Sequence, residues 1–282
     1  MSVETINKKR KKIVILSIIL NLLVFLIFLV LGFLFFFTYW YYVLISIVII
    51  ILLLYLESKF LIMPLYDSLI IQLMHLTFQN RYPNYDIEKS KDKNHLFGYF
   101  FNEDKAVISN HILFDDKKVS WDMFDFTINK SKKDKDPTLY GKYVKISKKN
   151  ICNDSFAFFS QNKLLTEQFK EYFSNKYSKG NDSITTLKKN KSYFCYYNQN
   201  YDYDFINCFE ELDDFNSVIM EKDKIEFVML TKEDGFHFRL QDKLNQDVIF
   251  YIKDKYALTF KIIDKILRVA KGKEEHHVQK NS

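Results

Sequence analysis

Apolar side chains dominate one long stretch near the start of the chain. From Ile13 to Leu56 the sequence runs for 44 residues without a charged side chain. A helix rises about 1.5 Å per residue and the hydrocarbon core of a bilayer is about 30 Å thick, so roughly 20 residues cross it once. The stretch therefore predicts two membrane-spanning helices, over 13–34 and 40–58, which form a transmembrane hairpin over 13–58.

Aromatic residues mark the predicted turn between the two spans. Tyr39, Trp40, Tyr41 and Tyr42 follow one another there. Trp and Tyr are enriched where a helix meets the lipid–water interface, because their rings are apolar and their tips are polar. We therefore predict these four residues as interfacial anchors.

Basic residues directly precede the first span and predict its orientation. Lys8, Lys9, Arg10, Lys11 and Lys12 lie next to it, whereas the connecting turn has no Lys or Arg. Lys and Arg near a span favour the cytoplasmic side. A cleaved signal peptide would have an apolar core of only about 7–15 residues. The pattern predicts an uncleaved multi-pass protein of the cell membrane, with a basic N-terminus (1–12) and both termini in the cytoplasm.

The charge balance supports a membrane partner. The formal net charge is +6, and the N-terminal cluster accounts for most of it. Such a cluster suits the anionic headgroups of the inner leaflet. The charge is not spread along a face as a nucleic-acid site requires, so we predict a bilayer partner and no nucleic acid.

A second patterned segment follows the spans. Over 59–80 the polar residues Ser68, Gln72, His75 and Gln79 recur at spacings of four, three and four. This draws one polar stripe along an apolar helix, and Pro64 is expected to kink or restart that helix. The segment predicts a juxtamembrane amphipathic helix. It could lie on the bilayer, pack on its own domain, or pair with a second copy as a homo-oligomer.

After residue 81 the pattern changes to short apolar and aromatic runs separated by polar turns, which is typical of strands. It predicts a cytoplasmic α+β domain over 81–270 with a mostly antiparallel sheet. A helix is expected over 164–177, and 178–182 is the best candidate for an internal boundary. The expected strands lie at 96–101, 105–109, 122–128, 142–146, 156–159 and 193–197.

The last third of the domain predicts two hairpins between two helices. An acidic helix is expected over 204–215, and the cluster Glu210, Glu211, Asp213 and Asp214 is then its solvated face or, alternatively, a cation site. The first hairpin pairs 225–230 with 236–240 through an Asp-Gly turn, and the second pairs 248–252 with 256–260. A basic helix over 261–269 and a disordered tail over 271–282 follow.

Sequence motifs for catalysis are missing from the chain. There is no phosphate-binding glycine loop, no HExxH and no GxSxG, so the common nucleotide, zinc-hydrolase and serine-hydrolase sites lack support. The three cysteines Cys152, Cys195 and Cys208 are irregularly spaced, as expected of reduced thiols. We predict no catalytic, cofactor-binding or metal-binding residues, and the enzyme question stays open.

Four short segments carry a resemblance to a known family. They are Lys59–Leu65, Leu139–Ile146, Glu226–Thr231 and Ile249–Ile262. These segments resemble a bacterial family named domain of unknown function three-one-three-seven, although Gly141 precedes Lys142 here, whereas the family tends to the reverse order. The resemblance implies a membrane hairpin, a Pro-containing juxtamembrane helix and a β-rich cytoplasmic domain, and no catalytic residues are established for the family.

Three functions stay open on this pattern. The first is a membrane-anchored scaffold or binding domain that recruits an unknown protein partner or assembles with itself. The second is an enzyme acting on membrane lipids or envelope precursors. The third is a lipid-headgroup reader, for which Lys261, Lys265 and Arg268 on the last helix would be the first candidates.

Overall fold

The chain is described by a computed structural model that divides it into two compact units. A helical unit comprises Met1–Arg81 and Phe238–Tyr251, and a sheet unit comprises Tyr82–His237 and Ile252–Ser282. Each is described by itself below. The structure describes residues 2–36, 40–90, 106–128, 139–152, 155–160, 176–177, 179–185, 192–197, 203–209, 215–231 and 244–280.

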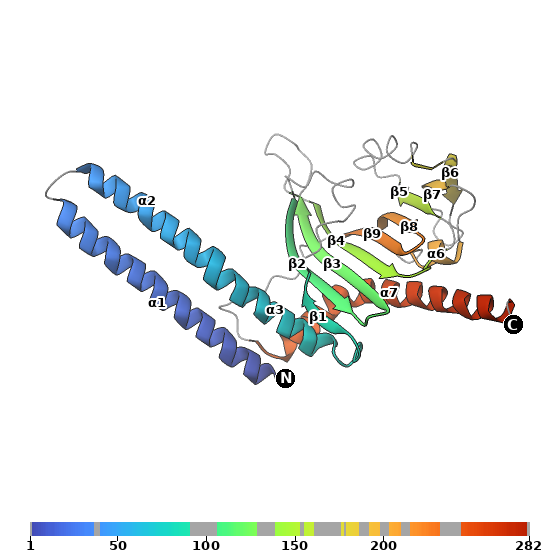
Figure 1. Ribbon diagram of the computed structural model, residues 1–282, viewed down its shortest axis with the longest axis horizontal. Helices are drawn as coiled ribbons and strands as arrows, with labels where there is room; N and C mark the ends of the chain where they lie inside the picture. Colours follow the sequence, from blue (N-terminus) through green and yellow to red (C-terminus); the bar gives the residue numbers. More distant parts are fainter. Residues whose placement is uncertain are drawn as a thin grey trace. The chain divides into compact units, whose positions relative to one another are not determined.

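Two long helices form the hairpin of the helical unit. Helix α1 spans Val3–Phe36 and helix α2 spans Trp40–Glu57, and they run side by side along their length (Figure 1). The second helix matches the expected span. Helix α1 begins at Val3, ten residues before the start of the expected first span, because Lys, Arg and Glu are good helix formers. The Ser2 Oγ accepts a hydrogen bond from the Thr5 N–H at 3.2 Å and caps the first turn.

The predicted juxtamembrane helix is helix α3, Met63–Phe78. A wide π-helical turn, η1, spans Ser58–Ile62 and joins it to α2. Pro64 lies in the first turn of α3, where its missing N–H breaks no hydrogen bond of that helix. The expected restart at Pro64 therefore takes the form of a wide turn directly before the proline.

Two of the described helical stretches are long and apolar enough to cross a membrane. They are Val3–Phe33 and Ile47–Phe78. Large apolar side chains on both are exposed, among them Leu22, Leu26, Phe33, Val48 and Ile51. The predicted pair of apolar N-terminal helices is thus confirmed.

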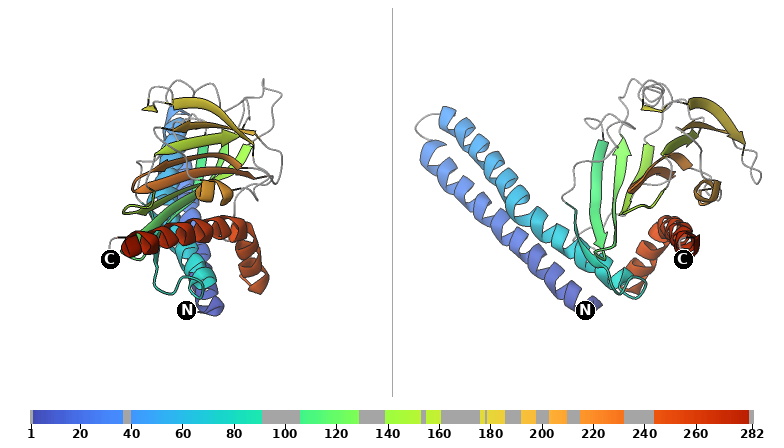
Figure 2. Two further views of the ribbon diagram at one scale, coloured as in Figure 1. Left: turned by 90° about the vertical axis from the view of Figure 1, so that its right-hand side faces the viewer. Right: turned by 45° about the vertical axis from the view of Figure 1, so that its right-hand side comes forward.

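The sheet unit holds one nine-stranded sheet in which every pairing is antiparallel. The strand order is β1-β2-β3-β4-β9-β8-β5-β7-β6, and Figure 2 shows the strands turning from one end of the sheet to the other. This confirms the mostly antiparallel sheet. The strands are β1 Asp86–Lys89, β2 Ala106–Asp115, β3 Val119–Ile128, β4 Leu139–Lys148, β5 Phe156–Ser160, β6 Lys179–Thr185, β7 Ser192–Tyr197, β8 Phe215–Glu221 and β9 Lys224–Thr231.

Helices pack on one face of this sheet, and an aromatic cluster fills part of the other. Helix α6 (Tyr203–Asn207) and the part of helix α7 (Gln246–Lys280) from Ile252 onward cover the first face, where the Phe260 ring contacts the Phe114 ring at 5.6 Å. On the second face Phe124 stacks on Tyr143 at 4.8 Å between ring centres. A core sheet with helices on one side matches the expected α+β class.

Gly141 is required by the close approach of two neighbouring strands. A Cβ atom there would lie 2.3 Å from Cζ of Phe126 and 2.6 Å from the backbone oxygen of Met229. Phe126 and Gly141 are directly paired across β3 and β4, so the ring lies over the glycine. The glycine lets a large aromatic residue pack against β4 where any other residue would clash.

The second predicted hairpin is wrong. Residues 248–252 and 256–260 belong to one helix, α7, instead of two strands. The apolar run before Lys253 has the residue types of a strand, but the buried positions Ile249, Ile252, Tyr256 and Phe260 are spaced by three and four. Packing on this helical face overrides the local strand preference. The basic helix expected at 261–269 lies inside α7.

Three further boundaries differ from expectation. Residues 179–182 of the candidate break lie in strand β6, which pairs with β7. The acidic helix is short: α6 ends at Asn207 and Phe215 begins strand β8. The expected disordered tail from 271 is helical as far as Lys280.

Several expectations fall on residues outside the described ranges. These include the strand at 96–101, most of the helix at 164–177, the partner strand at 236–240 of the first hairpin, and the acidic cluster. The strand at 225–230 is confirmed as part of β9, and β8 is its hairpin partner through the turn at Lys222 and Asp223.

Candidate functional site

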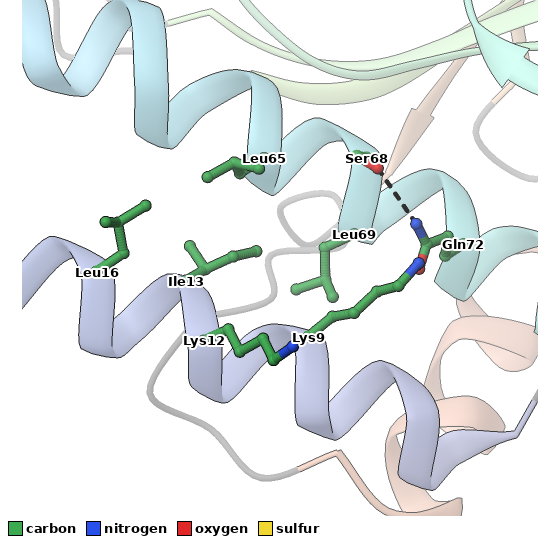
Figure 3. A pocket seen from close by; sticks show the side chains of 8 residues that line it. All are labelled: Lys9, Lys12, Ile13, Leu16, Leu65, Ser68, Leu69 and Gln72. Carbon is green, nitrogen blue, oxygen red and sulfur yellow. Dashed lines mark hydrogen bonds between the residues drawn. The ribbon is translucent and has the colours of Figure 1, made fainter.

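The basic cluster lies on the first turns of α1 and is divided between different sides of the helix. Lys9 and Lys12 line a cleft between α1 and α3 (Figure 3), whereas Lys8 and Lys11 are not among its lining residues. Lys8 forms an exposed ion pair with Glu4 at 3.4 Å. Arg10 is buried, with 7% of its surface exposed. Lys9 and Lys12 are thus the two lysines of the cluster that line the cleft.

A cleft of about 350 Å³ lies between α1 and α3 within the helical unit. Ser68 and Gln72 of the polar stripe of α3 line it, as Figure 3 shows. The Lys9 Nζ donates a hydrogen bond to the Gln72 Oε1 at 2.9 Å, and the Gln72 Nε2 donates to the Ser68 Oγ at 3.2 Å. The remaining walls are apolar: Ile13 and Leu16 from α1, and Leu65 and Leu69 from α3.

A lysine and a tyrosine that the sequence analysis did not single out lie at the end of α2. The Lys59 Nζ donates a hydrogen bond to the Tyr55 hydroxyl at 3.2 Å and lies 5.5 Å from the centre of that ring. Tyr and Lys at the end of an apolar helix are typical interfacial residues. Of the predicted anchors, Tyr39 lies outside the described residues, and Trp40, Tyr41 and Tyr42 are placed in the first turn of α2.

The sheet unit carries a polar pocket of about 260 Å³ across its first four strands. The register places Asp122 of β3 directly beside Lys145 of β4 and Leu113 of β2, so these side chains share one face of the sheet. The Asp122 Oδ1 lies 3.0 Å from the His111 Nε2. The pocket is lined by Glu88, Lys89, Ser90, Ser120, Asp122, Lys145 and Ser147, with Leu113 as its apolar member.

This pocket presents both signs of charge and three hydroxyl groups to a ligand. Asp122 is buried, with 5% of its surface exposed, and a carboxylate at the base of a pocket accepts charge-assisted hydrogen bonds. Sequence reasoning missed the pocket because its residues come from four strands spread over sixty positions. The alternation within each strand places them on one face, but only the strand order brings them together.

A buried ionic network on the opposite face of the sheet fixes α7. The Lys142 Nζ lies 2.5 Å from the Asp125 Oδ1, and the Tyr256 hydroxyl donates to the Asp125 Oδ2 at 2.7 Å. Asn110, at a bulge in β2 with φ of 53°, donates to the same oxygen at 2.8 Å. Burial, and then the Asp125 charge, raise the pKa of Tyr256 well above its ordinary value. The network holds a helix on a sheet and has the character of a structural site.

A second network lines the other face at the β8–β9 hairpin. Glu226 is buried and accepts a hydrogen bond from the Tyr143 hydroxyl, and the Lys224 Nζ lies 3.0 Å from the Glu226 Oε1. Burial acts to raise the pKa of Glu221, but hydrogen bonds and charge from Lys176 and Lys224 outweigh it, so that pKa is lowered. These ion pairs tie the hairpin together.

The cysteines are unsuited to nucleophilic chemistry. Cys152, Cys195 and Cys208 are free and buried. Burial raises the pKa of the Cys208 thiol to about 12, although the nearby Lys265 acts to lower it. A thiol of this pKa is not a thiolate at neutral pH. Among the described residues no group of three or more His, Cys, Asp or Glu side chains could hold a metal ion.

The lysines and arginine proposed for a headgroup reader lie on α7. Lys261 and Arg268 are exposed and Lys265 is half-buried. They fall at spacings of four and three, on one side of the helix.

Comparison with protein-family models, with curated proteins and with solved structures found no match to the chain. The resemblance to domain of unknown function three-one-three-seven therefore stays a prediction. Any functional conclusion has to come from the two units themselves.

Proposed function

We propose that the protein is a membrane-anchored scaffold or binding protein of the cytoplasmic face of the cell membrane. Helices α1 and α2 span the bilayer over 13–34 and 40–58, and both termini are cytoplasmic. The observation that carries the proposal is the outer surface of the hairpin. Leu22 and Phe33 are 61% and 74% exposed. Large apolar side chains exposed over a whole helical surface would be unfavourable in water, so they indicate a surface that contacts lipid or a partner.

The basic cluster supports the orientation. Lys8, Lys9, Lys11 and Lys12 lie at the end of the apolar run of α1, where positive charges favour the cytoplasm and the anionic inner leaflet. Lys59 next to Tyr55 places a further interfacial pair at the matching end of α2. Charges therefore flank the hairpin at one end only.

The sheet unit is the binding module in this proposal. Its polar pocket combines a buried carboxylate, Asp122, with the ammonium group of Lys145 on the next strand. Convergent charges in a concave site are typical of binding sites for polar ligands or polar segments of a partner. A cytosolic protein partner that docks here would be held at the membrane.

The test is affinity purification of the tagged full chain in mild detergent, with mass spectrometry of what remains bound. We expect a stoichiometric partner that is lost from an Asp122→Lys variant, because the buried charge of the pocket changes sign. The control is Asp86→Lys on exposed strand β1, which should retain the partner. Equal capture by wild type and both variants would contradict the role of the pocket.

A second candidate function is an enzyme that acts on membrane lipids or envelope precursors. One observation favours it: the His111 Nε2 lies 3.0 Å from the Asp122 Oδ1, and a carboxylate can hold an imidazole as a general base. Lipid extracts incubated with the full chain in nanodiscs would reveal a product by mass spectrometry. A product that persists in His111→Gln would argue against this pair as the catalytic group.

A further inference from the structure

The cleft between α1 and α3 joins a basic region to an apolar one. Lys12 is the last charged residue before the apolar run and Ile13 is the first residue within it, and both line the cleft. Figure 3 shows the two lysines at one end and Leu16 with Leu65 at the other. The cleft therefore crosses from charged to apolar surface within about two helical turns.

The basic end of the cleft has the chemistry of an anion site. Its described lining contains two ammonium groups, from Lys9 and Lys12, and no carboxylate. The hydrogen-bond acceptor that Lys9 meets there is the neutral amide of Gln72. Gln72 and Ser68 can donate as well as accept hydrogen bonds, so a phosphate group between the helices would meet polar groups from both sides.

The apolar end suits a hydrocarbon chain. Ile13, Leu16, Leu65 and Leu69 form its walls, and Leu16 and Leu65 are each 38% exposed. The cleft volume of about 350 Å³ is at the lower end of the roughly 300–1,000 Å³ range of small-molecule sites. That volume is smaller than one turn of a helix about 10 Å across and about 5.4 Å long, which argues for a lipid rather than a helical protein segment.

We propose that this cleft binds one anionic phospholipid. The phosphate lies between Lys9 and Lys12 of α1 and the Ser68–Gln72 pair of α3, and an acyl chain follows Ile13, Leu16 and Leu65 into the bilayer. The proposal rests on the proposed placement of the hairpin in a membrane. It adds a specific site to the general attraction between a basic cluster and anionic lipid.

The two lysine pairs of α1 provide a matched test. Native mass spectrometry of the full chain in detergent would measure binding of phosphatidylglycerol and of phosphatidylcholine with the same acyl chains. The pair variant K9Q/K12Q removes the two cleft lysines. The control K8Q/K11Q removes the same charge from two lysines of the cluster that do not line the cleft.

We expect one phosphatidylglycerol to bind the wild type in preference to phosphatidylcholine. K9Q/K12Q removes both ammonium groups that would pair with the phosphate, so it should weaken that binding about tenfold or more. K8Q/K11Q should weaken it less than about twofold. Equal weakening by the two pairs, or equal binding of both lipids, would overturn the site.

A third variant separates the acyl-chain part of the site from its charge. Leu16→Trp adds bulk to the apolar end and leaves both lysines in place, so it should also lower phosphatidylglycerol binding. Unchanged binding would overturn the cleft as the location of the acyl chain. Membrane extraction of every variant is the folding check: a chain that does not integrate contradicts the proposed function, whereas an integrated chain without lipid selectivity contradicts only the lipid site.

Discussion

The helical unit exposes its large apolar side chains, whereas the sheet unit buries them. Leu22 and Phe33 of the hairpin point outward, whereas Trp121, Phe114 and Phe156 of the sheet unit are fully buried. Within the sheet unit, helix α7 is amphipathic and buries Ile252, Tyr256 and Phe260 on one side, as a helix does at a water-exposed surface. The difference supports the proposal that lipid surrounds the hairpin and water surrounds the sheet unit.

Charged groups follow the same division. The apolar run of the hairpin has no charged residue from 13 to 56. The sheet unit buries charges, but in contact with partners: Asp125 with Lys142, and Glu226 with Lys224. An unpaired charge is costly in either place, so the hairpin excludes charges and the sheet neutralises them.

The largest expected effect comes from breaking the buried ion pair of the sheet unit. Asp125→Ala leaves Lys142 buried without its carboxylate and should lower the free energy of unfolding by about 3–5 kcal/mol. Chemical denaturation of the full chain, followed by the fluorescence of buried Trp121 in a Trp40→Phe background, would measure it. The matched control Asp86→Ala, on an exposed strand position, should change stability by less than about 0.5 kcal/mol. Similar losses for both would contradict the account of the network.

A charge introduced on the exposed surface of each unit tests whether that surface faces lipid or water. Leu22 in α1 and Leu258 in α7 are 61% and 44% exposed. Leu22→Arg should make membrane insertion less favourable by about 2.5–3.5 kcal/mol, because it places a guanidinium at the centre of a span. Leu258→Arg should be nearly neutral, since it faces water. The fraction of each chain that resists alkaline extraction from membranes is the measurement, and tolerance of both substitutions would argue against a bilayer around α1.

A methyl group added at a glycine tests packing in the two units. Gly141→Ala forces Phe126 and the β4–β9 pairing apart and should destabilise the sheet unit by about 1–3 kcal/mol. Gly32→Ala meets no heavy atom within 4 Å, and alanine favours the helix by up to about 1 kcal/mol. Thermal melts of the two variants should therefore shift in different directions. A neutral Gly141→Ala would show that the strands are less closely packed than described.

The smallest expected effect is a dependence on pH that is confined to the sheet unit. The pKa of Glu221 is lowered in the folded protein. Its stabilising contribution is therefore present above the unfolded pKa of about 4.3 and is lost as the pH falls through the folded pKa. Glu221→Gln should cost under about 1 kcal/mol at pH 7 because the ion pairs are partly exposed.

That difference between wild type and Glu221→Gln should shrink as the pH is lowered below 4, as measured by urea denaturation at several pH values. The helical signal of the hairpin should not change over the same range, because the apolar run of α1 and α2 has no ionisable carboxylate. A difference that stays constant with pH would contradict the assigned role of Glu221.

The hairpin was predictable because its signal is local. A run of 44 uncharged residues between Lys12 and Glu57 indicates helices whatever the rest of the chain does. Strands β3, β4 and β7 were also found near their observed bounds, since aromatic and β-branched runs ended by polar turns are local signals too. The predicted element type was wrong at 248–260, where a run of Val, Ile, Phe and Tyr that is typical of a strand forms part of helix α7 instead.

The sites were not predictable in the same way. The stripe of Ser68 and Gln72 was visible in the sequence, but its neighbour Lys9 is 63 positions away from Gln72 and meets it only because the hairpin folds back. Tyr256 meets Asp125 across 131 positions. Such contacts depend on strand order and helix packing, which spacing along the chain does not encode.

The central claim is that the hairpin crosses the membrane and leaves both termini in the cytoplasm. The most direct test is cysteine labelling of intact cells with a membrane-impermeant maleimide. The native cysteines are buried, so the wild type gives a low background. We predict that Thr38→Cys is labelled from outside, whereas Ser282→Cys is labelled only after the membrane is permeabilised. Labelling of Ser282→Cys in intact cells, without labelling of Thr38→Cys, would contradict the orientation and the function built on it.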